Sequence, residues 1–171
     1  DGNLVISDTA TNLAAMSATV AAEASSITVS AGEATVAEAV ALDAFAATDA
    51  STVTISDTMA NLTTGAADAA TLTIMKAQSG GNFIISDATS VADVVALEAA
   101  ITGGGGITAV ATGYTLTDTN AQLLTQDGNG EAVDDALTVN VTDAITVAEV
   151  GALATAYTIT GDDATPGTHL T

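Results

Sequence analysis

Arginine, cysteine and tryptophan are absent from this chain, and Lys76 is its only lysine. Against that one basic side chain stand 21 acidic residues, which give a formal net charge of −20 at pH 7. Neutralising phosphate groups requires Lys and Arg, so nucleic acid is excluded as a partner, and an anionic membrane surface would repel the chain. The lack of cysteine excludes a disulfide-stabilised secreted scaffold.

Aromatic residues are also scarce: they make up 2% of a chain that is 48% hydrophobic. The apolar mass is therefore Ala, Val, Leu and Ile, which suits many thin, regular layers better than one thick globule. No apolar run approaches the roughly 18 residues needed to span a bilayer, so membrane insertion is not expected.

The usual catalytic side chains are few. His169 is the only histidine, and no cysteine nucleophile or Ser–His pairing is available. Paired carboxylates can hydrolyse glycosides, but that chemistry uses aromatic or cationic subsites, and the chain has two Tyr, two Phe and no Trp. We therefore expect a protein that is not an enzyme.

Two kinds of strand–helix unit, which we call rungs, alternate along the chain. The first kind reads "VISDTATNLAA", "TISDTMANLTT" and "TLTDTNAQLLT", and the second ends in "TVAEAVALDAF", "SVADVVALEAA" and "TVAEVGALATA". Corresponding residues recur after 49 and 61 positions in the first kind and after 55 and 56 in the second. This predicts a single repeat domain over residues 1–171, with double repeats near 4–51, 52–106 and 107–156 and a partial rung at 157–171.

Each rung carries a helix start signal. A hydroxyl residue is followed three positions later by an acid or amide, as in a capping box. The six pairs are Thr9 with Asn12, Thr35 with Glu38, Thr58 with Asn61, Ser90 with Asp93, Thr119 with Gln122, and Thr146 with Glu149. We expect a helix to begin at each of them.

The segments before these signals alternate between apolar and polar residues, which is typical of strands with one buried face. The residues expected on the core face are Leu4 and Ile6, Ile27 and Val29, Val53 and Ile55, Phe83 and Ile85, Val139 and Val141, and Tyr157 and Ile159. A strand that feeds a helix and returns to a parallel strand forms a right-handed crossover.

These patterns predict an α/β fold: an open right-handed β/α solenoid of about six rungs. One continuous parallel sheet would lie on one face and short Ala-rich helices on the other. A doubly wound sheet fits less well, because its strands would be continuously apolar. The alternative is a solenoid dominated by β-structure, with short helical turns.

Two stretches break the regularity. "TLTIMKAQSGG", residues 71–81, reads as an extra strand and turn, with Thr71 and Thr73 as one of several outward T-x-T pairs. "ITGGGGITAVATG", residues 101–113, contains four consecutive glycines that suit a loop, followed either by more loop or by another edge strand. Insertions in repeat arrays usually lie on one face, often the contact face.

The strongest metal candidate in the sequence is a calcium site. "QDGNGEAVDD" places oxygen donors at alternating positions in a glycine-containing loop, as Ca²⁺ requires. The candidate ligands are Asp127, Asn129, Glu131, Asp134 and Asp135. The pattern lacks the full EF-hand spacing, and a solvated acidic turn is the simpler interpretation.

Other aspartates also have two interpretations. Asp162 and Asp163 form a weaker calcium candidate. The aspartates that end or follow the strands could form turns and helix caps, which we favour, or a ladder of metal ligands. They are Asp8, Asp57, Asp87 and Asp118.

The "(I/L)(S/T)DTxxNL" pattern, followed by "ITVS" and "TVAEAxAL", resembles repeats of large secreted bacterial surface proteins. These are adhesin-like or surface-layer-like chains of cyanobacteria and proteobacteria, and the resemblance covers most of residues 4–159. It implies a passive structural role outside the cell, at the cell surface, often with calcium-assisted folding. We expect self-association into a filament or layer; the alternative is an adhesin-type module that binds glycan or another cell surface.

Overall fold

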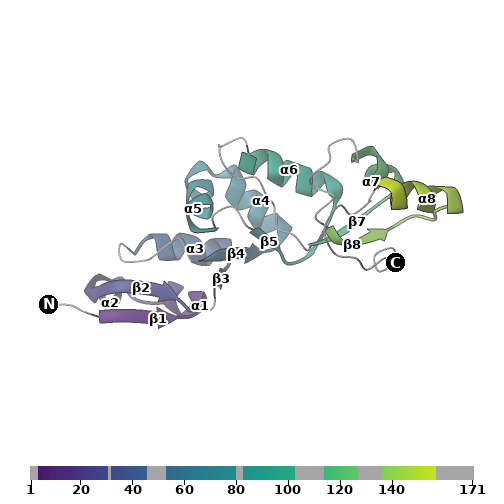
Figure 1. The fold of residues 1–171 in the computed structure, drawn as a ribbon. Helices are drawn as coiled ribbons and strands as arrows, with labels where there is room; N and C mark the ends of the chain where they lie inside the picture. The colour runs from purple at the N-terminus through teal and green to yellow at the C-terminus, as the bar shows by residue number, and fades with distance from the viewer. Residues whose placement is uncertain are drawn as a thin grey trace.

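The computed structural model describes residues 4–30, 32–45, 53–79, 83–102, 114–126 and 136–156. Over these ranges the fold is mixed α/β, and every strand pair is parallel. In Figure 1 the elements follow one another along the molecule, from β1 and β2 at one end to α7 and α8 at the other. The elements are β1 (Leu4–Asp8), α1 (Ala10–Ala14), α2 (Ala18–Glu23), β2 (Ala24–Val29), β3 (Glu33–Ala34), α3 (Val36–Asp43), β4 (Thr54–Asp57), α4 (Met59–Ala67), α5 (Ala69–Ser79), β5 (Phe83–Ile85), β6 (Ala88–Thr89), α6 (Val91–Thr102), β7 (Tyr114–Asp118), α7 (Asn120–Gln126), β8 (Ala136–Val141) and α8 (Val147–Ala156).

The strands form three separate sheets, with orders β1-β2, β3-β4-β5 and β6-β7-β8. The expectation of one continuous sheet is therefore wrong. No closed barrel is formed by the described strands. Several parallel sheets, each with helices beside it, make up the observed architecture.

The sheets are separate because the chain bends after the long strand of a rung of the second kind, as it does after β2 and β5. The residue after the strand donates its N–H to the carbonyl of the preceding strand's aspartate: Ser30 to Asp8 (2.7 Å) and Ser86 to Asp57 (2.9 Å). After Ser30 the chain turns at Gly32, which has a positive φ of 75°. Beyond the bend it pairs with the next strand along, as β3 does with β4 and β6 with β7.

Most of the expected core positions on the strands are confirmed. Buried side chains include Ile27, Val29, Val53, Ile55, Phe83, Ile85 and Val139. The expectation for Leu4 is wrong: it is 43% exposed, and β2 is the one strand among the described residues that pairs with β1. Tyr157 and Ile159 lie outside the described residues.

All six helix start signals are confirmed. In each, the hydroxyl accepts the N–H of the residue three positions later, over 3.2 to 3.3 Å. Two are full capping boxes, because Glu38 and Glu149 also accept the backbone N–H of Thr35 (2.9 Å) and Thr146 (2.7 Å). At the Ser90 cap, the hydroxyl instead donates to the Asp93 carboxylate (2.7 Å).

Residues 71–81 are not an extra strand, because α5 runs through Ala69–Ser79. Asp68 accepts the Thr71 N–H (2.8 Å), and the Thr73 hydroxyl donates to the Ala69 carbonyl (2.8 Å), which is a helical i−4 bond. Met75 is fully buried, with Leu72 packed against the same core. Two sequence signals compete here with equal strength: apolar residues spaced i and i+3 favour a helix, and alternating threonines favour a strand. Packing against α3 and β4 stabilises the helix.

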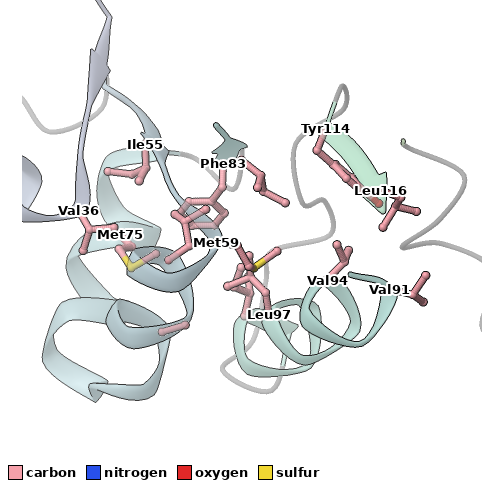
Figure 2. Packing of buried hydrophobic residues seen from close by; sticks show 14 of the residues in the cluster. Val36, Ile55, Met59, Met75, Phe83, Val91, Val94, Leu97, Tyr114 and Leu116 are labelled. Carbon is pink, nitrogen blue, oxygen red and sulfur yellow. The ribbon is translucent and has the colours of Figure 1, made fainter. Parts of the chain in front are cut away.

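The core is divided into two clusters that each cross several rungs. The smaller one joins α1, α2, β2 and α3, and the larger one extends from α3 to α8. Figure 2 shows Phe83, Met59 and Met75 packed together on one side, and Val94, Tyr114 and Leu116 on the other. Ala, Val, Leu, Ile and Met fill most of both clusters, as the shortage of aromatics leads one to expect. Of the helices in the described ranges, none has the length and apolarity that crossing a bilayer requires.

Two glycine-to-alanine substitutions test the packing of α4. A Cβ at Gly65 would lie 2.9 Å from both Met75 Sδ and Val36 Cγ1, whereas a Cβ at Gly151 in α8 meets nothing within 4 Å. We expect Gly151→Ala to raise the free energy of unfolding by about 1 kcal/mol through helix propensity. Gly65→Ala should lower it by about 1 kcal/mol or more, because overpacking outweighs the same gain. Urea denaturation measures both, and stabilisation by both variants would contradict this packing.

Candidate functional site

The rungs can now be numbered from the observed elements. Rung 1 is β1 and α1, rung 2 is β2, β3 and α3, rung 3 is β4 and α4, rung 4 is β5, β6 and α6, rung 5 is β7 and α7, and rung 6 is β8 and α8. Helices α2 and α5 are additions to this scheme. Helices of neighbouring rungs pack together, as α1 does with α3, α4 with α6 and α7 with α8.

A carboxylate joins each of four pairs of consecutive rungs. In each case the first N–H of one helix donates to an aspartate of the next rung. The bonds are Val36 N–H to Asp57 Oδ2 (3.0 Å), Met59 N–H to Asp87 Oδ1 (2.8 Å), Val91 N–H to Asp118 Oδ2 (3.2 Å) and Asn120 N–H to Asp143 Oδ1 (2.8 Å). We call these four aspartates the aspartate ladder.

Asp57 shows why this position suits an acid. Its Oδ1 accepts the N–H of Thr58 (2.8 Å) and the Nδ2–H of Asn61 (2.7 Å), so one carboxylate orients its own helix start and caps the neighbouring helix. The side chain is only 7% exposed. The first N–H groups of a helix have no partner within the helix, and a negative charge there also opposes the helix dipole.

The junction between rungs 1 and 2 differs. The residue after Ser30 is Ala31, where the later rungs have Asp87 and Asp143, so the sequence provides no ladder carboxylate there. The Thr11 hydroxyl instead donates to Glu38 Oε1 of rung 2 (2.7 Å). Between rungs 5 and 6 a similar bond, from Asn120 Nδ2 to Glu149 Oε1 (3.1 Å), supplements the ladder.

Hydrogen bonds hold several of these acids in the charged form. The Asn12 side chain and the Thr9 N–H lower the pKa of Asp8. The Thr146 N–H and hydroxyl lower the pKa of Glu149. At Glu38 partial burial raises the pKa, but the bonds from Thr11 and Thr35 outweigh it, and the pKa ends below its usual value.

A concave surface lies between α4 and the start of α6. Its volume is about 470 Å³, and it is lined by Met59, Ala60, Thr63, Thr64, Asp87, Ala88, Thr89, Ser90 and Asp93. Both lining carboxylates are already engaged, Asp87 with the Met59 N–H and Asp93 with the Ser90 N-cap. The lining contains no aromatic or cationic side chain.

The calcium candidates of the sequence fall outside the described residues. This applies to Asp127, Asn129, Glu131, Asp134 and Asp135, and equally to Asp162, Asp163 and His169. Across the ranges that the structure describes, no group of three or more His, Asp or Glu side chains is placed to hold a metal ion. The calcium site at residues 127–135 therefore stays a prediction.

Asp8, Asp57, Asp87 and Asp118 take the turn and cap roles that we favoured from the sequence. Asp8, Asp57 and Asp118 each accept the N–H of the next residue, and Asp87 caps α4. What sequence reasoning missed is that Asp57, Asp87 and Asp118 also accept the first N–H of the helix in the preceding rung, and that Asp143 does the same. A signal was present, since Asp87 and Asp143 both stand three residues before a helix N-cap, at Ser90 and Thr146.

No family model, curated protein or solved structure matches the chain. The resemblance to secreted surface repeats therefore stays a prediction, and the aspartate ladder is the feature of the chain on which a functional proposal can be based.

Removing a ladder carboxylate should loosen the array. We expect Asp57→Ala to lower the free energy of unfolding by about 3 kcal/mol, because it removes a cap and leaves the buried Val36 N–H without an acceptor. Asp57→Asn keeps one oxygen and should lose less. Urea denaturation monitored by circular dichroism measures both.

The matched control is Asp8→Ala, which removes the same two bonds within a rung but no bond between rungs. An equal loss of stability at Asp8 and Asp57 would show that the bond between rungs contributes nothing.

Proposed function

We propose that the chain is a non-enzymatic structural protein of the cell exterior, built as an open right-handed β/α solenoid. It would assemble into a filament or surface layer through end-to-end or side contacts. The aspartate ladder is the observation that carries this proposal: the same junction occurs four times along the chain. A junction that repeats with the same polarity suits an array that extends in one direction.

The hydrogen bonds made by the acidic side chains support a scaffold role. Acids that could in principle do acid–base chemistry are bound to backbone N–H groups and hydroxyls at the helix starts, as at Asp57, Asp118 and Glu149. Such bonds fix the geometry of the rungs and occupy the lone pairs that a substrate would need. A framework role therefore accounts for these residues without further partners.

Charge makes assembly dependent on the ionic environment. Two copies with a net charge of −20 each repel one another, and screening at 0.1 M salt acts over about 10 Å. We propose that salt or Ca²⁺ promotes assembly, and that residues 127–135 are where Ca²⁺ would bind.

Light scattering and negative-stain microscopy across ionic conditions test this function. We expect monomers in low salt with EDTA, and filaments or sheets in about 0.5 M NaCl or in millimolar Ca²⁺, because counterions reduce the repulsion. The adhesin-type alternative would stay monomeric under all these conditions and would bind glycans on an array. Monomers throughout would contradict the structural proposal.

A further inference from the structure

The first residue of each helix is buried in every rung except the last. Its exposed fraction is 3% for Ala10, 8% for Val36, 6% for Met59, 1% for Val91 and 7% for Asn120. The corresponding residue of rung 6, Val147, is 91% exposed. In the earlier rungs the following rung covers this position, and no described residue covers it in rung 6.

The opposite end of the array has the complementary surface. Strand β1 pairs with β2 along one edge, and no described strand pairs with its other edge. Leu4 is 43% exposed, whereas its counterparts in the later rungs, Val53 and Tyr114, are each 2% exposed. Val5, whose neighbour Ile6 is partly buried, is 63% exposed.

Asp8 is the third feature of this end of the array. It occupies the position of Asp57 and Asp118 in the rungs of the first kind, and its Oδ1 accepts the bonds from its own rung. In Asp57 and Asp118 the Oδ2 atom accepts the first N–H of the preceding helix. Among the described residues no helix precedes Asp8, and the bonds that Asp8 accepts from them go to Oδ1.

The internal junctions also give the register of a continued array. Where a rung of the second kind meets one of the first, Ala34 lies opposite Ile55 and Thr89 opposite Leu116. The equivalent segment of rung 6 is Ala144 and Ile145, which have no strand partner within the described part of the chain. Carried over to the free ends, the same register places Ala144 opposite Val5 and Ile145 opposite Ile6.

We propose that rung 1 of one copy docks on rung 6 of a second copy and continues the aspartate ladder across the junction. Asp8 of one copy accepts the Val147 N–H of the other, and β1 covers the exposed Val147 side chain. This inference rests on the proposed function, since it names the contact through which assembly occurs. Such a contact is heterologous and leaves one free end at each step, so it produces a polar filament.

A second copy fits this end better than the remainder of the same chain. The sequence of residues 157–161, "YTITG", repeats the pattern of β7 but has Gly161 where Asp118 stands. Aligned in this way, the segment has no aspartate at the ladder position, whereas rung 1 of another copy has Asp8 there.

Sedimentation velocity over a range of protein concentrations in about 0.5 M NaCl tests the proposal. Val147→Asp and Asp8→Ala should each weaken association by roughly ten- to hundredfold, because each disrupts a charge-assisted bond and its surrounding contact. Val147→Asp should leave the monomer folded, since the site is exposed and an acid at a helix start is favourable. The matched controls are Val40→Asp and Asp43→Ala on α3, which make the same charge changes away from both ends and should leave association unchanged.

A chain without cysteine allows a direct check of register. Val5→Cys combined with Ala144→Cys should form disulfide-linked oligomers on mild oxidation, because the two residues would be neighbours on adjacent strands. Val5→Cys combined with Val40→Cys should not form them.

Each other outcome has a defined meaning. If the Val147→Asp and Asp8→Ala variants associate as strongly as the wild type, this junction is overturned. Assembly would then occur by side contacts, and the proposed function would survive. Wild type that never associates would overturn both. Association that required deletion of residues 157–171 would make that segment the occupant of rung 6 and would also overturn the proposal.

Discussion

The arrangement of the rungs depends on one interaction: an aspartate at or just after the end of a strand accepts the first N–H of the helix in the preceding rung. Without the aspartate, the first N–H of each helix that is buried between rungs would have no acceptor. Water could not easily reach it to take the place of the carboxylate. The interaction also explains how a chain with one lysine and 21 acids can fold. The ladder places acids such as Asp57 at the positive ends of two helices, so local dipoles take the part that cations play in other proteins.

The local features of this fold were predictable because they depend on residues close in the sequence. A capping signal needs only a hydroxyl and an acceptor three positions apart, and Thr35 with Glu38 forms the bonds that this spacing predicts. The buried strand faces follow from alternation in the same way, as at Ile27 and Val29. The candidate site was predictable in part: the cap role of Asp57 could be inferred, since it too is local.

The remaining features depend on contacts between rungs, which no short pattern encodes. The break into three sheets arises where the N–H groups of Ser30 and Ser86 donate to carbonyls of the preceding strand and the chain then bends. A continuous sheet was therefore the wrong expectation. Helix α5 was mistaken for a strand because Thr71 and Thr73 alternate, while its buried Met75 becomes informative only once α3 and β4 are in place. The partner of Asp57 across the junction, Val36, lies 21 positions away and has no signature of its own.

Hydrogen exchange at the first amide of each helix tests the ladder most directly. These amides have no partner within their own helix, so they exchange quickly unless another rung supplies an acceptor. In dilute monomer, the account predicts slow exchange at the amides that donate to the ladder, Val36, Met59, Val91 and Asn120, and fast exchange at Ala10 and Val147. Equal and fast exchange at all six would contradict it.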